Sequence, residues 1–550
     1  MMDAYVKGIK DVLLTLKSRL DSHEDEVVFT LKGVANGEVL MPETIPSQEA
    51  ENVRALSGWV ANVGPTNVLV MIQSVLAQPG TLSGAGGSAI DQIYNDPRFA
   101  ANPPPLGEGK DKLSLARLAI LLVSYIFYDE FHYPQPETGV YNISGDAFQK
   151  LKWLYRYWFN QLEVAEKASG LEDIFMSQML DVVCDKQDAS ISSACVSCAG
   201  DLLAVDVLTP ENTPHLFDEI TDFYSTADIV SANLESTVDM SQPIGRTQAS
   251  GQPARMNTSQ MMFDKFRHEA GINYFSTATN HAMDWGICGL NATLDVLEKS
   301  GAYYSGTTKS CAEKGKEQDG FTIIEKNGIR IAMLAYTFDL NGYNTPADMP
   351  YLVNVVRFND ADPKPNYSLI EKQVAAAKAK GADWIIAYCH WGWEFEMYPH
   401  ENIREAAHKV IDCGVDTILG NHAHVSQPAE LIPREGKQDA LVVYAFGDFV
   451  SYHPESRNSK LAYIVKFNIV KPSGIGMGSV SLTNLQALPI YIVNQHLGGK
   501  RYDCRIVRFD SVLKNPDGYG LTELEKSQLP HLEEKVWNDI LSPLSRLGTR

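Results

Sequence analysis

The stretch ILGNHAHV, residues 418–425, decides how this chain is interpreted. A short apolar run typical of a buried strand leads into a glycine, an asparagine and two histidines, His422 and His424. Residues i and i+2 of an extended chain point to the same side, so both imidazoles are expected to face one place. A single buried histidine is more often a core residue than a ligand, so a metal site here needs partners elsewhere in the chain.

The composition is that of a globular protein with a strongly acidic balance. Of 550 residues, 44% are hydrophobic and 21% are charged, which is enough apolar mass for a full core. The formal net charge of −21 argues against nucleic-acid binding, which needs a basic surface to displace counterions from phosphates. It also disfavours a polyanionic ligand unless the site carries metal cations or a local basic patch.

The first residues and the cysteines favour a cytoplasmic chain. Residues 1–20 mix Lys7, Lys10 and Asp11 into apolar positions, which predicts an amphipathic helix and no secretory signal. The most apolar stretch, 115–128, is shorter than the roughly 20 residues that span a bilayer, so we expect a buried helix and no transmembrane segment. Eight cysteines do not make a disulfide framework, and reduced thiols are the expectation.

The pattern along the chain predicts an α/β fold in three segments. Residues 1–190 are mostly helical in pattern, and the sequence does not indicate their role. Residues 191–500 alternate between strand-like and helix-like runs, which is typical of sheets covered by helices. Within them, residues 402–414 place apolar side chains at i, i+3, i+4, i+7 and i+8, so a helix with one buried face is expected. Residues 501–550 form a C-terminal extension.

Five strand-like runs of the middle segment end in residues that can bind a metal ion. Ligands of open α/β sheets bind at the carboxyl ends of strands, so these ends converge if the strands lie side by side. The residues concerned are Asp201, Glu235, Asn280 with His281, His390, and His422 with His424. Each has an ordinary structural explanation alone, and it is their conjunction that predicts a shared site.

The chemistry of this set indicates the cofactor. Carboxylates, an amide oxygen and imidazoles suit Mn, Fe or Zn, with Mg as a further candidate, and they do not form a thiolate site. The set exceeds the four ligands of a structural zinc and is about right for two ions that share a carboxylate. The sequence therefore predicts one or two divalent metal ions.

Six segments of residues 192–455 together resemble the metallophosphatase (calcineurin-like phosphoesterase) superfamily, and more closely its CapA-type capsule synthesis (poly-γ-glutamate biosynthesis) branch. They are AGDLL (199–203), ADIVSANLE (227–235), STATNHAMDWGICGL (276–290), HWGWEFEMYP (390–399), GNHAHVSQPAE (420–430) and YAFGDFV (444–450). The resemblance implies a metallophosphatase-like αββα sandwich, with an extra mostly helical N-terminal region before it.

The resemblance also implies roles for the residues at the strand ends. Six would bind metal: Asp201 and His424 the first ion, Glu235 both ions, and Asn280, His390 and His422 the second. His281 would lie near the substrate and donate a proton or a hydrogen bond to a leaving or developing oxygen. Asp284 could orient His281 or could serve only as a turn residue.

The sequence departs from the pattern of typical metallophosphatases, although the relatives' Gly-His-His-Pro-His, here Gly420-Asn421-His422-Ala423-His424, keeps both expected ligands. Leu203 stands where typical metallophosphatases have the histidine of Asp-x-His, as is usual in the capsule branch, and this leaves the first ion with only three protein ligands. Asp448 stands where relatives usually have asparagine. The thinner ligand set leaves open whether one or two ions bind.

Three functions follow from these observations. The first is a metal-dependent hydrolase of a phosphoester or amide-type bond, acting on a small molecule or a polyanionic polymer. The second, implied by the family, is a part in making, exporting or trimming poly-γ-glutamate. The third is a non-catalytic metal-binding scaffold that keeps the same fold.

Overall fold

The computed structural model describes residues 21, 60–61, 64–77, 128–141, 147–159, 162–180, 182, 191–248, 253–310, 319–472 and 479–547. The helix predicted at residues 1–20, and all but the last residue of the helix predicted at 115–128, lie outside this part of the chain. The chain divides into two compact units: residues 1–134, 142–163 and 248–253, and residues 135–141, 164–247 and 254–550.

The first unit is helical where it is described. Its helices are α4 (Pro65–Ala77), α8 (Tyr128–His132) and α9 (Ala147–Trp158). The last two pack through Phe131 and Tyr155, whose rings meet edge to face at 5.4 Å between centroids. Among the described residues of the whole chain, no helix combines the length and the hydropathy that crossing a bilayer requires.

The second unit is built on two sheets. The first has the order β16-β15-β14-β1-β2-β5-β6, with β13 beside the end of β1. Its strands are β1 (Ile191–Leu202), β2 (Ile229–Leu234), β5 (Tyr274–Ser276), β6 (Tyr303–Ser305), β13 (Asp448–Val450), β14 (Leu461–Pro472), β15 (Ser481–His496) and β16 (Tyr502–Arg508).

The second sheet has the order β11-β12-β10-β9-β8-β7. Its strands are β7 (Thr322–Lys326), β8 (Ile329–Thr337), β9 (Trp384–His390), β10 (Thr417–Asn421), β11 (Ala429–Ile432) and β12 (Ala440–Val443). A separate hairpin pairs β3 (Gly245–Thr247) with β4 (Arg255–Asn257). The sheets face each other, since the Tyr388 hydroxyl on β9 lies 2.6 Å from the Ser231 hydroxyl on β2.

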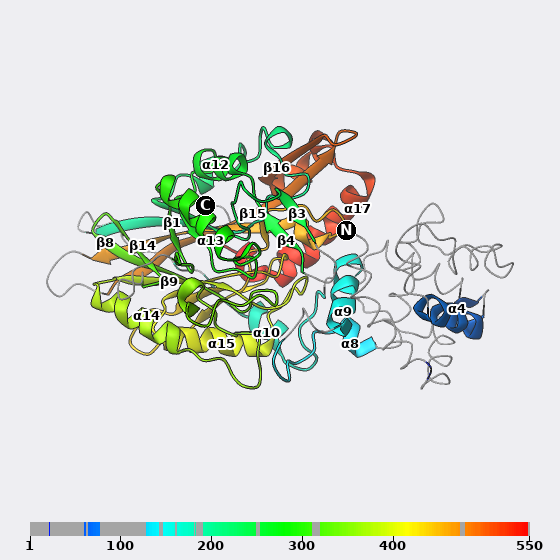
Figure 1. Ribbon diagram of the computed structural model, residues 1–550, viewed down its shortest axis with the longest axis horizontal. Coiled ribbons are helices and arrows are strands. Elements are labelled where there is room, and N and C mark those ends of the chain that lie inside the picture. Colours follow the sequence, from blue (N-terminus) through cyan, green and yellow to red (C-terminus); the bar gives the residue numbers. More distant parts are fainter. Residues whose placement is uncertain are drawn as a thin grey trace. The chain divides into compact units, whose positions relative to one another are not determined.

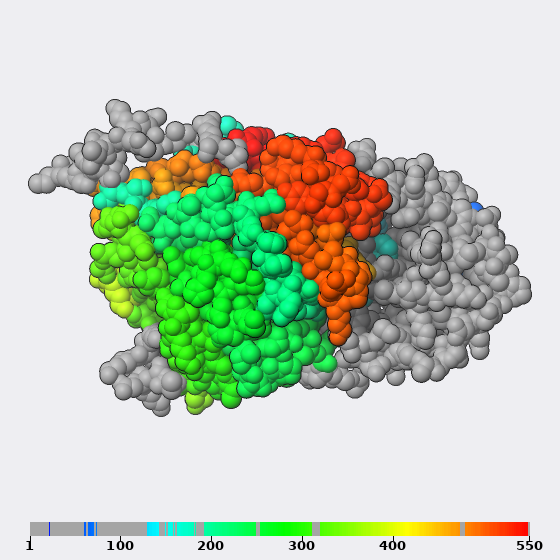
Figure 2. All heavy atoms as spheres, turned by 90° about the horizontal axis from the view of Figure 1, so that it is seen from above, coloured from blue at the N-terminus to red at the C-terminus, as the bar shows by residue number. Residues whose placement is uncertain are grey.

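Helices cover the outer faces of this sandwich, so the predicted αββα arrangement is confirmed (Figure 1). The helices of this unit are α10 (Leu171–Met176), α11 (Thr221–Tyr224), α12 (Gln260–His268), α13 (Gly286–Lys299), α14 (Ser368–Ala379), α15 (Glu401–Asp412), α16 (Phe509–Lys514), α17 (Glu523–His531) and α18 (Ser542–Ser545). Short 3₁₀ turns lie at Pro210–Asn212, Pro350–Leu352, Asn458–Lys460 and Pro516–Tyr519, and a π-helix spans Leu532–Ile540. Figure 2 shows one face of the molecule, where the green α12–α13 region and the orange-red C-terminal residues both reach the surface.

The sequence patterns match these layers in physical terms. All seven residues of β9 are buried, because a parallel strand inside a two-sheet sandwich is covered on both faces. The helix predicted at 402–414 is α15, and its five predicted apolar positions are all buried. The five strand-like runs do not lie side by side in one sheet, however. β1, β2 and β5 belong to the first sheet, and β9 and β10 belong to the second.

Two glycines set how closely the backbone can pack where these strands end. A Cβ atom on Gly420 of β10 would lie 1.8 Å from the carbonyl oxygen of Tyr444, and one on Gly200 would lie 1.9 Å from that of Gly447. Neither neighbour is a flexible side chain that could move aside. Only glycine therefore fits at these two positions.

Replacing Gly420 with alanine is expected to destabilise the second unit by about 3 kcal/mol or more, because the backbone of Tyr444 must shift. Chemical denaturation of the purified chain measures this loss. Gly139→Ala is the matched control, since nothing lies within 4 Å of its added Cβ. Equal stability of the two variants would show that the close approach at Gly420 is not rigid.

A buried cluster of charged side chains holds the segment that follows β9 in place. His400 Nδ1 lies 2.9 Å from Glu166 Oε1, and its Nε2 lies 2.5 Å from Glu396 Oε2. The imidazole stacks on Trp393 at 3.8 Å between centroids. Burial disfavours the imidazolium form, but the two carboxylates outweigh it and raise the pKa of His400 to about 9. The cluster therefore holds this loop through a cation at neutral pH.

The stability of the chain is expected to depend on pH through His400. Because its pKa is raised on folding, its contribution is complete below the unfolded value of about 6.5 and disappears as the pH rises through about 9. The free energy of unfolding should fall by up to about 3 kcal/mol between pH 6.5 and 9.5. In the His400→Gln variant, the free energy of unfolding should be low over this whole pH range and nearly independent of pH. Parallel curves for the two proteins would contradict this assignment.

Candidate metal centre

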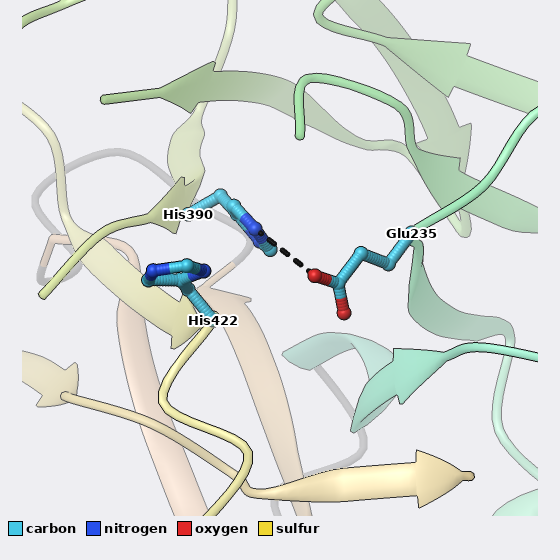
Figure 3. A group of neighbouring side chains, drawn as sticks. All are labelled: Glu235, His390 and His422. Atoms are coloured by element: carbon cyan, nitrogen blue, oxygen red, sulfur yellow. Dashed lines mark ion pairs between the residues drawn. The ribbon is translucent and has the colours of Figure 1, made fainter. Parts of the chain in front are cut away.

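Buried polar side chains from both sheets meet where their strands end. Asp201 is the penultimate residue of β1, Glu235 directly follows β2, His390 ends β9, and His422 follows β10. All four are at most 2% exposed. Figure 3 shows Glu235 reaching from the first sheet toward His390 and His422, which come from the second sheet. The centre therefore lies between the two layers of the sandwich.

Glu235, His390 and His422 form the first of three groups with the geometry of a metal site. Each offers one ligand atom, and these atoms lie within 4.8 Å of one another. His390 Nε2 is 3.5 Å from Glu235 Oε1 and 2.8 Å from Asn280 Oδ1. Burial, together with three neighbouring histidines, lowers the pKa of His390 well below its usual range. Its imidazole is therefore neutral, which is the form that binds metals.

Asp201, Glu235 and His424 form the second group, also within 4.8 Å. His424 Nε2 is 3.7 Å from Glu235 Oε1, while its Nδ1 is 2.8 Å from Asp448 Oδ1. A carboxylate on one ring nitrogen is the usual support for a histidine whose other nitrogen binds a metal. Asp201 Oδ1 accepts a hydrogen bond from Asn233 Nδ2 at 2.7 Å. Glu235 belongs to both groups.

The backbone at the two histidines differs from the extended geometry that the sequence predicts. β10 ends at Asn421, and His422 and His424 have φ values of 93° and 54°. Non-glycine residues rarely adopt such values, and strain of this kind concentrates at functional sites. The two rings therefore do not simply project from one side of a strand, and they enter different ligand groups. The prediction of an extended His-x-His pair is wrong in its geometry.

The environment of Glu235 tests whether these residues fit a metal ion. Both of its carboxylate oxygens are buried and accept no hydrogen bond from a described residue. The nearest imidazole nitrogens, at 3.5 and 3.7 Å, are too far away for hydrogen bonds. Burial raises the pKa of Glu235 well above its usual range, and it raises the pKa of Asp201 to about 7. A bound cation would supply the missing partner, so the donor set fits one.

His281 and Asp284 lie beside the groups and belong to none of them. His281 Nδ1 is 2.8 Å from Asp284 Oδ2, and that oxygen also accepts the Met256 backbone N–H at 2.6 Å. Asp284 is 1% exposed and His281 is 7% exposed. The carboxylate therefore fixes the orientation of the ring and leaves Nε2 available. Asn280 precedes His281 and contacts His390 directly.

Two residues of the centre were missing from the site predicted from the sequence. They are Asp448, which the sequence marks only as a departure from the family pattern, and His453. Together with His424 they form a third group within 4.8 Å, with His453 Nε2 3.4 Å from Asp448 Oδ2. Burial lowers the pKa of His453 to about 3. His453 follows the end of β13 by three residues, so the rule of strand ends could have indicated it.

Comparison with known proteins agrees with this arrangement. Residues 185–453, which carry the whole centre, match the model of the family described as bacterial capsule synthesis protein PGA_cap. The PGA biosynthesis protein CapA of Bacillus subtilis is 26% identical over 272 residues, covering 48% of this chain. The capsule biosynthesis protein CapA of Bacillus anthracis is 23% identical over 286 residues, covering 49% of this chain. The chain spans 64% of the length of each relative.

A solved structure of the sulfate thiohydrolase SoxB from Thermus thermophilus aligns with 49% of this chain and 39% of its own, at 12% identity and a TM-score of 0.24. That score is too low to support any inference about this chain. The family match rests on residues 185–453 and includes every metal-ligand type found at the strand ends. Residues 185–453, and with them the whole centre, are therefore similar to the bacterial capsule synthesis protein (PGA_cap) family.

Proposed function

We propose that the PGA_cap domain is a metal-dependent hydrolase that cleaves a phosphoester or amide-type bond in a substrate linked to capsule polymer biosynthesis, such as poly-γ-glutamate. The observation that carries this proposal is the Glu235 carboxylate, which is buried between two candidate ligand groups and accepts no hydrogen bond from any residue that the structure describes. The names of the two CapA relatives support the link to a capsule polymer.

The residues divide into two sets of ligands under this proposal. Glu235 would bridge both ions, Asp201 and His424 would complete one site, and Asn280, His390 and His422 would complete the other. Bound divalent ions lower the pKa of water from about 15.7 towards 7 and offset charge on the reacting oxygens. Asp448 holds the ring of His424 so that Nε2 faces Glu235.

His281 is the proposed proton donor to the leaving oxygen. Its Nδ1 is held by Asp284, so Nε2 can carry a proton toward the reacting group. The neighbouring Asn280 holds this segment against His390. A general acid oriented by a buried carboxylate contributes about 10²- to 10⁴-fold to the rate.

A non-catalytic metal-binding scaffold is the second candidate. The observation that favours it is Leu203, which is buried at the end of β1 and offers no ligand. The Asp201 side of the centre therefore depends on Glu235, His424 and the neighbouring Asp448 and His453. Metal content and activity together distinguish a scaffold from a hydrolase.

The wild-type chain is expected to contain one or two divalent ions, measured by elemental analysis after purification with Mn²⁺. His390→Ala and His422→Ala should each lose at least one ion, since each removes a ligand. Hydrolysis of general phosphomonoester and phosphodiester substrates should fall about 100-fold. His408→Ala is the matched control, because this half-exposed histidine on α15 lies outside the ligand groups. Bound metal without any hydrolysis would favour the scaffold.

His281→Ala is expected to retain the full metal content while kcat falls by about 10²- to 10⁴-fold, because it removes a proton donor and no ligand. Asp284→Asn should cause a smaller fall, since the ring remains but loses its carboxylate partner. Steady-state kinetics and elemental analysis of the same preparations provide the measurement. Loss of metal in His281→Ala would instead make this residue a ligand.

A further inference from the structure

Arg255, on β4, is a cation that forms no ion pair with any described residue. Arg246, on the paired strand β3, has a carboxylate partner in Asp206 at 3.2 Å. The chain has a net charge of −21, so carboxylates that could pair with this guanidinium are abundant. Its position is nevertheless well defined by two aromatic residues.

The guanidinium of Arg255 is held by Tyr343 and Trp285. Its Nε donates to the Tyr343 hydroxyl at 3.0 Å. Its Cζ lies 5.0 Å from the Trp285 ring centroid and 5.7 Å from that of Tyr343. Cation–π contacts orient the planar group without neutralising it. Arg255 therefore keeps its full charge and most of its N–H donors.

Two connections link this arginine to residues beside the metal centre. The next residue, Met256, donates its backbone N–H to Asp284, which also holds the proposed proton donor His281. Trp285, under the guanidinium, follows Asp284 directly in the chain. A shift of Arg255 would therefore change the position of His281.

The second connection runs through Tyr343. Two residues before it, Asn341 accepts a hydrogen bond from the side chain of Asn280 at 3.2 Å. Asn280 in turn contacts His390 at 2.8 Å. Both residues that hold Arg255 are thus one or two positions away from residues that contact the centre.

Trp285 supplies an independent sign of a missing ligand. Its indole Nε1 is buried and has no hydrogen-bond acceptor among the described residues. Buried indole N–H groups normally find a partner, because leaving one unsatisfied costs free energy. An oxyanion bound by Arg255 could accept from this N–H as well.

We infer that Arg255 and Trp285 bind a second, non-reacting anionic group of the substrate, a carboxylate or a phosphate next to the bond that the centre cleaves. This inference rests on the proposed function, since it takes the substrate to react at the metal ligands. The fork of an arginine on an aromatic face matches either oxyanion with two parallel hydrogen bonds. It also explains how a strongly acidic protein accepts an anionic substrate, because the basic contact is local.

Equilibrium binding to the metal-loaded full-length chain tests the inference without requiring turnover. Glutarate carries two carboxylates, and its monoamide, glutaramate, carries one, so the ratio of their Kd values isolates the second anionic group. The wild type should bind glutarate about 10- to 100-fold more tightly than glutaramate, as expected for a charge-assisted bidentate contact. 4-Phosphonobutanoate separates a phosphate-type partner from a carboxylate by the same comparison.

Arg255→Gln should abolish the preference for glutarate while metal content is unchanged, and Trp285→Phe should reduce it several-fold because only the N–H is lost. Arg434→Gln is the matched control, since Arg434 also stacks on a tryptophan, Trp384, but is paired with Asp416. A preference retained in Arg255→Gln, or absent from the wild type, overturns the inference. Absence of bound metal in the wild type would instead count against the proposed function. The ratio of the Kd values for glutarate and glutaramate would still be measured, so the two failures can be told apart.

Discussion

The structure of the centre depends on one carboxylate, that of Glu235, which is fully buried and accepts no hydrogen bond from the described residues. A buried carboxylate in this position is costly unless a cation or a proton satisfies it. Its neighbours are imidazoles from the opposite sheet at 3.5 and 3.7 Å, and it is shared by two ligand groups. The surrounding architecture is best understood as the means of holding this charge in place.

Within each sheet, a glycine lets neighbouring chain segments approach closely at the strand ends. Gly200 of β1 packs against the backbone just before β13, and Gly420 of β10 packs against the backbone just after β12. Beyond β9, the imidazolium of His400 binds Glu166 and Glu396 and holds the loop that starts at His390. Side chains of the centre that come from distant parts of the sequence thus keep fixed relative positions.

The position of the centre was predictable from the sequence because polar residues follow the apolar runs that form the strands. The apolar runs before Asp201, Glu235, His390 and His422 indicate buried strands, and the polar residue after each run indicates the site. Periodicity also predicted α15, because its buried face repeats at helical spacing. These features are local, and local sequence determines them.

The remaining features depend on contacts that no local pattern encodes. The division of the five strands between two sheets follows from tertiary pairing, and the positive φ values of His422 and His424 follow from packing after β10. The place of His453 beside Asp448, and of Arg255 on Trp285, required the folded chain. Residues of this kind are recognisable only once their neighbours are known.

Anomalous diffraction from crystals of the Mn²⁺-loaded chain tests the central claim most directly. We expect at least one anomalous peak within about 2.3 Å of a Glu235 carboxylate oxygen, with imidazole nitrogens of His390, His422 or His424 completing the contacts. A Glu235 carboxylate surrounded only by protein atoms, with manganese absent or bound elsewhere, would contradict the account.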